Sequence, residues 1–527
     1  MEKIKILLQN NALILSYCIP CCFVLCYFIF MCVWGPSLIR FVGESDDYLL
    51  LSVALEKNFS DIVSPEVIAQ AQLDFPGLPW NEWIREFEKG ALHLPLTVNN
   101  NSYSWYFVTY PLLCLPAKFL LKAAGIHQIF AFYLTNLLLL LFSVLISLKW
   151  MKELIFCKNS YASLLLLSVN LPYLFWASNE ICLMSCMTLA SSALFSKRYI
   201  YSALFTGLAA TLNVTAILFF IFVWLKFFYR NSEFLSFKPS VLRQCMINLG
   251  TAYKKTFVFI LFTIIGFIPI LINLIRWNKI AVMQNMGSIN GSTERFLAYV
   301  FDLNFGILPY YPFVLLIFIM LLFVLKKEYL IYFITVCSII FSFSLMLNID
   351  CGMSFMSRYL AWTMPLILIG VFYYTRKYLL KCKILKAGKI FLWLSLCYSI
   401  IIIISYIPRH NFLVSDCIFH HPIAKRVFDL CPALYNPRYS TFNSRTNHIP
   451  GGYDIAQYVP IEYIDKNGNI RKVLVETCFI EPYLDYEIVF SPDLISDVEN
   501  ERRKAHNNHK KYQYLNFPKG VKKKMEK

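Results

Sequence analysis

Long apolar segments separated by short basic loops dominate this sequence and restrict what it can fold into. Hydrophobic residues make up 58% of the 527 residues and charged residues only 15%, whereas a soluble domain carries about 25% charged residues. Several runs reach the ~17–25 apolar residues of a transmembrane helix. We therefore expect an all-α polytopic membrane protein, because helices satisfy their own backbone hydrogen bonds inside a bilayer.

The net charge of +17 originates mainly in the loops. Most Lys and Arg residues lie in short connections between apolar runs, which is the pattern of cytoplasmic loops. The charge therefore gives no reason to expect nucleic acid as a partner, and the expected partner of the chain is the membrane. The basic residues near the end of the sequence would favour an anionic lipid surface.

The apolar runs predict about eleven membrane segments and a cytoplasmic N-terminus. Residues 12–34 are long enough to span and carry no signal-peptide cleavage site, so we expect an uncleaved anchor. Residues 35–104 then form a long first outer loop. Residues 105–123 are interrupted by Lys118 and Lys122, and a re-entrant or interfacial segment obeys the charge rule better than a full span.

Residues 201–228 are too long for one span and too short for two. Thr211, Asn213 and Thr215 interrupt their middle, so we expect a short helical hairpin whose polar tip points to the outer face. A single tilted helix is the alternative. Together the membrane segments and their loops define an expected membrane domain over residues 1–407.

The composition changes at residue 408. Residues 408–527 are polar and rich in Tyr, Pro and Asn, and we expect a small α+β or β-rich extracytoplasmic domain that ends in a flexible basic tail from residue 500. Residues 461–464 and 471–475 flank a turn that contains Asn467-Gly468. This spacing predicts a β-hairpin.

An acidic cluster follows the first apolar run directly and consists of Glu44, Asp46 and Asp47. Acidic side chains at the edge of a bilayer are costly unless they are solvated, paired or used. A carboxylate suits the role of a general base, and adjacent carboxylates raise the pKa of one of the two. The structural alternative is that the pair caps a helix that begins near Tyr48.

Four segments, in this chain order, resemble those of the GT-C class of integral-membrane glycosyltransferases, such as dolichyl-phosphate-mannose mannosyltransferases. They are Asp46-Asp47-Tyr48, Tyr110-Pro111-Leu112-Leu113, residues 301–312, and residues 352–360 with Pro365. The resemblance covers roughly residues 1–407. It implies a GT-C-like fold and transfer of a hexosyl group from a polyprenyl-phosphate-linked sugar to an envelope glycan, lipid or protein acceptor.

The resemblance also implies residue roles. Asp46 or Asp47 would be the catalytic base, and Arg358 with Tyr359 would bind the donor phosphate. Asn213 stands where many relatives carry a basic residue, so a second cation for the phosphate is not assigned. Further acceptor or donor contacts would come from Glu44, Glu180, Tyr110, Tyr310 and Asp350.

Each of these roles has a simpler alternative. Arg358 would also fit as an interfacial arginine, Glu180 as an ordinary loop acid, and the tyrosines as residues of the aromatic belt. The adjacent His420 and His421 do not make a metal site by themselves. No metal ligands are predicted, and a divalent cation as a cofactor is left open.

The predicted location is a bacterial inner membrane, with the C-terminal domain in the periplasm. Two other classes of function stay open, a secondary transporter or lipid flippase, and a non-catalytic envelope-assembly protein. Transporters usually show internal repeats and charged residues at the middle of the membrane. This sequence shows no repeat and gathers its acids at one face, which favours an enzyme over a transporter.

Overall fold

The computed structural model divides the chain into two compact units. The first, which we call the helical unit, comprises Met1–Phe296, Tyr310–Ile349 and Arg358–Ile404, and the second, the C-terminal unit, comprises Leu297–Pro309, Asp350–Ser357 and Ser405–Lys527. The structure describes residues 20, 22–24, 26–27, 35, 45–81, 84, 96–98, 101–104, 106–151, 158–166, 171–229, 234–236, 238–251, 253–278, 292–345, 356–379, 384–406, 419–449, 457–476 and 512–517.

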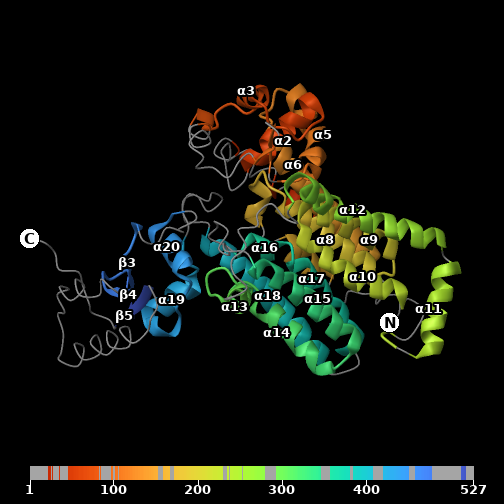
Figure 1. The fold of residues 1–527 in the computed structure, drawn as a ribbon. Coiled ribbons are helices and arrows are strands. Elements are labelled where there is room, and N and C mark those ends of the chain that lie inside the picture. The colour runs from red at the N-terminus through yellow and green to blue at the C-terminus, as the bar shows by residue number, and fades with distance from the viewer. Residues whose placement is uncertain are drawn as a thin grey trace, which may run out of the picture. The chain divides into compact units, whose positions relative to one another are not determined.

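Helices form nearly all of the helical unit (Figure 1), with one short β1–β2 hairpin in the first outer loop. The elements up to residue 406 are α2 (Ser45–Asn58), α3 (Pro65–Asp74), β1 (Leu96–Val98), β2 (Asn101–Tyr103), α5 (Thr109–Ala123), α6 (Phe130–Trp150), α7 (Lys158–Leu166), η2 (Leu171–Phe175), α8 (Glu180–Phe195), α9 (Tyr199–Leu212), η3 (Val214–Leu218), α10 (Phe219–Phe228), α11 (Pro239–Thr251), α12 (Tyr253–Trp277), α13 (Ser292–Phe301), α14 (Pro312–Met320), η4 (Leu321–Val324), α15 (Lys327–Ser344), α16 (Arg358–Ala361), α17 (Met364–Tyr374), η5 (Thr375–Leu379) and α18 (Ile384–Tyr406).

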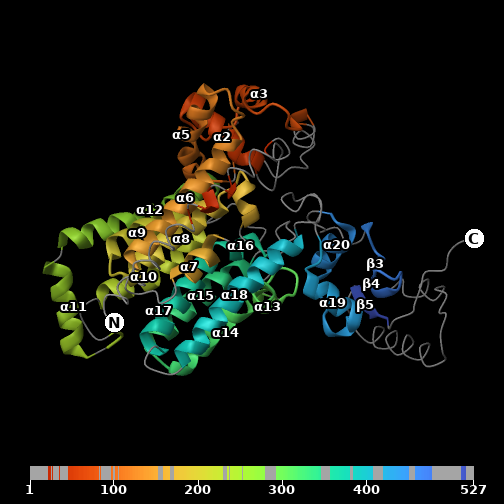
Figure 2. The same ribbon diagram turned by 180° about the vertical axis from the view of Figure 1, so that it is seen from behind.

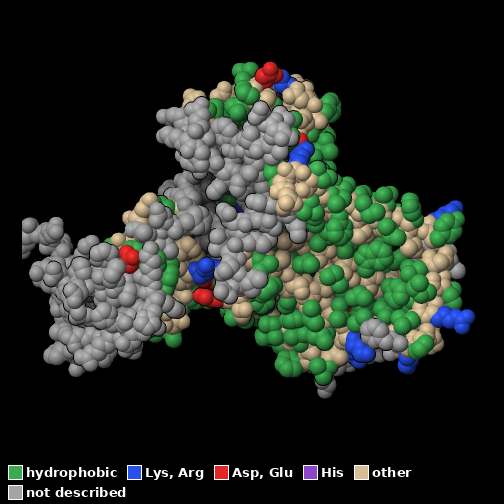
Figure 3. Space-filling view, viewed as in Figure 1, with side chains coloured by type: hydrophobic (Ala, Val, Ile, Leu, Met, Phe, Trp, Pro, Cys, Tyr) green, Lys and Arg blue, Asp and Glu red, His purple; other side chains and the backbone are tan. Residues whose placement is uncertain are grey.

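Within the described part of the chain, three helices are long and apolar enough to cross a membrane, namely α6, α12 and α15. Shorter apolar helices are α8, α9, η3 with α10, α14 with η4, and part of α18. The prediction of a helical membrane protein is confirmed at this level, but the structure supports three crossing helices by length, not eleven. Most of the first apolar run lies outside the described residues. Figure 3 shows hydrophobic side chains over a broad face of these helices.

The central helices of this unit pack closely. Helices α6, α8, α9 and α17 lie side by side in both views (Figures 1 and 2), and α12 packs along α9. A Cβ atom on Gly207 would lie only 2.5 Å from the carbonyl oxygen of Phe262. Glycine is therefore required at this crossing, since small residues let membrane helices approach closely.

The expected helical hairpin at residues 201–228 is confirmed. Helix α9 ends at Leu212, and Asn213 is extended (φ −148°, ψ 117°), with its side chain accepting a hydrogen bond from the Thr215 backbone N–H at 3.0 Å. Helix α10 then runs back along α9. The ring of Tyr199 at the start of α9 contacts that of Phe227 at the end of α10, with the ring centroids 5.9 Å apart.

A cluster of charged side chains joins α2, α3 and α5. The fully buried ammonium group of Lys118 lies 2.7 Å from Glu56 and 3.1 Å from Asp74, and Lys122 lies 2.7 Å from Glu56. We call these four residues the α2–α5 ion cluster. The two lysines that interrupt the apolar run 105–123 therefore pair with Glu56 of α2 and Asp74 of α3.

The α2–α5 ion cluster makes stability depend on pH. Burial alone would raise the pKa of Glu56 and of Asp74, but hydrogen bonds and the charges of Lys118 and Lys122 outweigh burial and lower both pKa values. A carboxyl group whose pKa is lowered by folding stabilises the folded state at pH values above its pKa in the unfolded chain, which is about 4. This contribution is lost as the pH falls through the pKa of the folded state. The thermal unfolding midpoint should thus stay constant between pH 7 and about pH 5, and it should decrease when the pH is lowered below about 4.

Thermal unfolding of the purified protein over this pH range is the measurement. The variant Glu56→Gln should show a flatter acid dependence than the wild type. The matched control is Glu66→Gln, because Glu66 is 76% exposed and pairs with Lys57 only at 3.7 Å. An acid dependence that is the same in Glu56→Gln and in the wild type would contradict this assignment.

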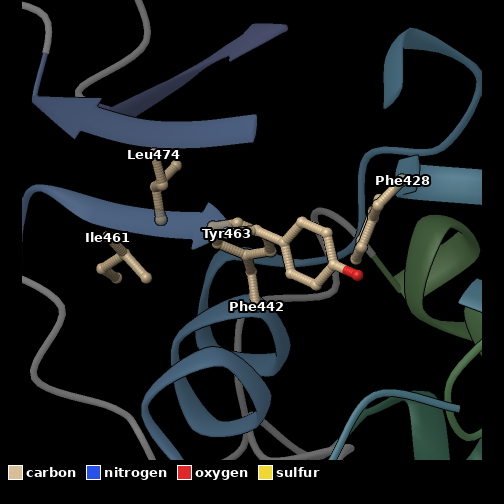
Figure 4. Packing of buried hydrophobic residues seen from close by; sticks show 5 residues of the cluster. All are labelled: Phe428, Phe442, Ile461, Tyr463 and Leu474. Carbon is tan, nitrogen blue, oxygen red and sulfur yellow. The ribbon is translucent and has the colours of Figure 1, made fainter. Parts of the chain in front are cut away.

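The C-terminal unit contains helices and an antiparallel sheet. Its elements after residue 406 are α19 (Pro422–Leu430), η6 (Pro432–Leu434), α20 (Tyr439–Asn447), β3 (Ile461–Ile464), β4 (Ile470–Glu476) and β5 (Tyr512–Asn516), and the strand order is β3-β4-β5. Figure 4 shows the core between the helices and the sheet, which consists of Phe428, Phe442, Ile461, Tyr463 and Leu474.

The predicted β-hairpin is confirmed. Strand β3 pairs with β4 through the register Ile461↔Leu474, and Gly468 in the connecting turn has a positive φ of 78°. The carboxylate of Asp465 accepts hydrogen bonds from the backbone N–H groups of Asn467 and Asn469 at 2.8 and 2.9 Å. These bonds close the turn, as asparagine and aspartate do in tight turns.

The end of the chain differs from the expectation of a flexible tail. Residues 512–516 form β5, which pairs with β4, and Leu515 and Phe517 are buried. The alternation of apolar and polar residues over this short strand is too brief to stand out from the charged sequence around it.

Candidate functional site

The acids of the first candidate motif lie in the first turn of α2 and are buried. Asp46 is 8% exposed and Asp47 is 5% exposed. The hydroxyl of Ser104 donates to Asp47 Oδ1 at 2.8 Å and accepts from the backbone N–H of Tyr106 at 3.1 Å. A carboxylate at a helix N-terminus is also stabilised by the helix dipole. The fold therefore holds the Asp47 carboxylate in one orientation.

Aromatic and amide groups connect the start of α2 with the segment before α8. The ring of Tyr48 contacts those of Tyr106 and Tyr110, with centroids 4.8 and 5.2 Å apart. The Tyr110 hydroxyl donates to Asn136 Oδ1 at 3.0 Å, and Asn136 Nδ2 donates to the carbonyl oxygen of Trp176 at 3.0 Å. Tyr110 is therefore a buried residue that positions its neighbours, and the N-termini of α2 and α5 lie close to the start of α8.

Two further candidates face each other. Glu180 begins α8 and Arg358 begins α16, and Arg358 Nη1 lies 3.7 Å from Glu180 Oε1. The Ser178 hydroxyl donates to the other oxygen of Glu180, and the guanidinium group lies 5.3 Å from the ring centroid of Tyr359. Both charged side chains are buried, and buried charges are stable only when they are paired.

The tip of the α9–α10 hairpin belongs to the same end of the helical unit. Thr109 at the start of α5 donates to the Thr211 hydroxyl at 2.9 Å, and the Asn179 side chain donates to the Leu212 carbonyl at 3.1 Å. The starts of α2, α5, α8 and α16 and this tip thus form one region, which we call the polar end.

The opposite end of the same helices is rich in lysine. Glu328 lies 3.0 Å from Lys226 at the end of α10 and 2.7 Å from Lys377 in η5. Near the start of α9, the Arg198 guanidinium lies 5.5 Å from the ring centroid of Trp150. The two ends of these helices therefore differ in charge, and the basic side chains gather away from the polar end.

The other predicted site residues are distributed differently. Tyr310 is fully buried in the helical unit, and Glu44 and Asp350 lie outside the described residues. Asp302 and Asn304, from the third motif, belong to the C-terminal unit. Among the described residues, no group of three or more His, Cys, Asp or Glu side chains is arranged to hold a metal ion.

Several residues of the polar end were not identified from the sequence. Ser104, Ser178 and Asn136 orient the candidate site residues, and only Asn136 carries a signal, because it is a polar residue inside an apolar run. The indole N–H groups of Trp176 and Trp362 are buried and, within the described part of the chain, donate no hydrogen bond.

Comparison of the chain with known family models, with curated proteins and with solved structures finds no match.

Proposed function

We propose that this chain is a GT-C-like glycosyltransferase that moves a hexosyl group from a polyprenyl-phosphate carrier to an envelope glycan, lipid or protein. The observation that supports this proposal best is the polar end, where buried Asp46 and Asp47 lie at one helix start and the Glu180–Arg358 pair at two others. Burying carboxylates and an arginine together costs free energy of folding, and sites that contain such groups are frequently functional.

In this reaction a carboxylate of α2 takes the proton of an acceptor hydroxyl. The acceptor oxygen then attacks the anomeric carbon, the bond from that carbon to the phosphate oxygen breaks, and the polyprenyl phosphate leaves with its charge held by Arg358. The anomeric configuration is inverted. A planar guanidinium group suits this role because it donates two parallel hydrogen bonds to phosphate oxygens. Glu180 orients the guanidinium group before the donor arrives.

A GT-C fold with about eleven membrane segments requires that the shorter apolar helices cross the membrane together with α6, α12 and α15. The acceptor would be reached on the outer face of a bacterial inner membrane. The N-terminus would then be cytoplasmic and the C-terminal unit periplasmic.

Arg358→Ala is expected to raise the donor KM by about 10- to 100-fold, because a hydrogen-bonded charge pair contributes about 1.5–3 kcal/mol. The measurement is transfer from radiolabelled mannosyl and glucosyl polyprenyl phosphates in membranes, together with mass spectrometry of the envelope glycan. Arg358→Lys keeps the charge and should be affected less.

The matched control is Arg276→Ala. This variant also loses an ion pair, with Asp61, and a contact with the Tyr103 ring, but Arg276 does not lie beside Glu180. If no variant changes transfer or the glycan profile, the chain is a transporter, a flippase or an assembly protein instead.

A further inference from the structure

We infer that the lysine-rich end of the helical unit binds the phosphate of an anionic phospholipid head group. The site, which we call the lysine site, consists of Lys197, Lys226, Glu328, Tyr373 and Lys377, and all five residues belong to the helical unit. It lies at the opposite end of the helices from the candidate active site, and the inference does not depend on sugar transfer.

One carboxylate serves two lysines in the lysine site. Glu328 Oε1 lies 3.0 Å from Lys226 Nζ, and Glu328 Oε2 lies 2.7 Å from Lys377 Nζ. The positive charges of Lys377 and Lys197 also act on Lys226. Glu328 is the only acid in the described segments that carry these residues, which are 196–200, 224–229, 326–330 and 373–379. The site therefore keeps a net positive charge, which an anionic ligand would balance.

Aromatic rings hold the end of α8 against η5. The ring of Phe195, two residues before Lys197, stacks on that of Tyr373 with the centroids 4.2 Å apart. The ammonium group of Lys377 lies 5.6 Å from the ring centroid of Tyr373 and 5.3 Å from that of Tyr378. Lys197 and Lys377 therefore belong to one site, although they are far apart in the sequence.

The backbone of Lys197 has a conformation that favours glycine. Its φ is 61°, its N–H donates to the Leu194 carbonyl at 3.0 Å, and the Arg198 N–H donates to the Ala193 carbonyl at 2.7 Å. These two bonds form the motif that ends a helix with a left-handed residue, which is usually glycine. A lysine here destabilises the end of α8, and residues held in such conformations cluster at functional sites.

The lysine site lies at the end of a candidate membrane helix. Helix α15, which is long and apolar enough to cross a membrane, begins at Lys327, directly before Glu328. Lys226 lies in the last turn of α10, and Lys197 follows the end of α8. The ends of membrane helices lie at the level of the lipid head groups. Basic pockets between such helices bind anionic head groups, and lysine holds phosphate as a point charge.

The test measures the binding of dioleoyl phosphatidylglycerol and of dioleoyl phosphatidylcholine to the full chain in detergent by native mass spectrometry. The wild type should bind phosphatidylglycerol about 10-fold more tightly than phosphatidylcholine. Lys377→Gln should lower the affinity for phosphatidylglycerol by about 5-fold, which is the contribution of one lysine near an anionic lipid surface. The affinity for phosphatidylcholine should not change.

Lys197→Gly separates binding from folding. It should also lower the affinity for phosphatidylglycerol by about 5-fold, whereas the thermal unfolding midpoint in phosphatidylcholine should stay the same or rise, because glycine suits this backbone. Lys57→Gln is the matched control for Lys377→Gln. The Lys57 side chain is 40% exposed, close to the 37% of Lys377, and it also pairs with an acid.

The inference is overturned if the wild type binds the two lipids equally, or if both lysine variants bind phosphatidylglycerol as the wild type does. Inorganic phosphate distinguishes the source of the anion. If it displaces phosphatidylglycerol, and by itself raises the unfolding midpoint of the wild type but not that of Lys197→Gly, the site takes free phosphate and the assignment to a lipid is wrong.

Discussion

Under the proposed function, Asp47→Asn is expected to lower the kcat of sugar transfer by about 10³-fold, within the range for loss of a general base. Asparagine keeps the size of the side chain and can still accept the hydrogen bond from Ser104, but it cannot take the acceptor proton. The measurement is transfer from the polyprenyl-phosphate sugars at saturating donor, with the amount of protein in the membrane determined in parallel.

Asp46→Asn is the matched control for this prediction. It changes the neighbouring acid of the same helix turn, but Ser104 bonds to Asp47, so the smaller loss is expected at Asp46. Ser104→Ala should lower kcat only several-fold, because the base is still present but is less well oriented. If Asp46→Asn loses all activity while Asp47→Asn keeps normal activity, the base is Asp46 and this prediction is wrong.

Lys118→Ala is expected to destabilise the protein by about 3–5 kcal/mol, the cost of leaving a buried charge without its partner. The substitution removes the one fully buried cation from the α2–α5 ion cluster, and the carboxylate of Asp74, only 4% exposed, then keeps a distant partner at 3.7 Å. Thermal or denaturant unfolding of the purified protein measures the effect.

Lys122→Ala provides the comparison, because its side chain is 44% exposed. Its loss should cost about 1 kcal/mol or less, as for an exposed ion pair. The triple variant Lys118→Met/Glu56→Gln/Asp74→Asn removes the charge of Lys118 and those of both its partners, and should recover part of the lost stability. Equal destabilisation by Lys118→Ala and Lys122→Ala would contradict the geometry.

The features of the fold that were predictable have local causes. The break at Asn213 and the turn at Asn467-Gly468 depend on residues that favour such geometry within a few positions. The partners of Lys118 were not predictable, because Glu56 and Asp74 lie on other helices. The strand β5 was missed for the same reason, since it depends on pairing with β4 far away in the sequence.

The candidate site shows the same division. Asp46 and Asp47 were singled out because acids at a membrane boundary are uncommon, and Arg358 because its segment resembles one of the GT-C class. The sequence contains no sign that Glu180 faces Arg358, or that Ser104 holds Asp47, because each pair is formed by tertiary packing. The third motif was expected to act within the membrane domain, but Asn304 is held by His420, His421 and Tyr435 of the C-terminal unit.

The strand order β3-β4-β5 has a consequence for biosynthesis. Strand β4 lies in the middle of the sheet and pairs with β5, which the ribosome delivers after all other described elements. Until residues 512–516 have been made, one edge of β4 is therefore unpaired, and an unpaired strand edge can pair with another chain.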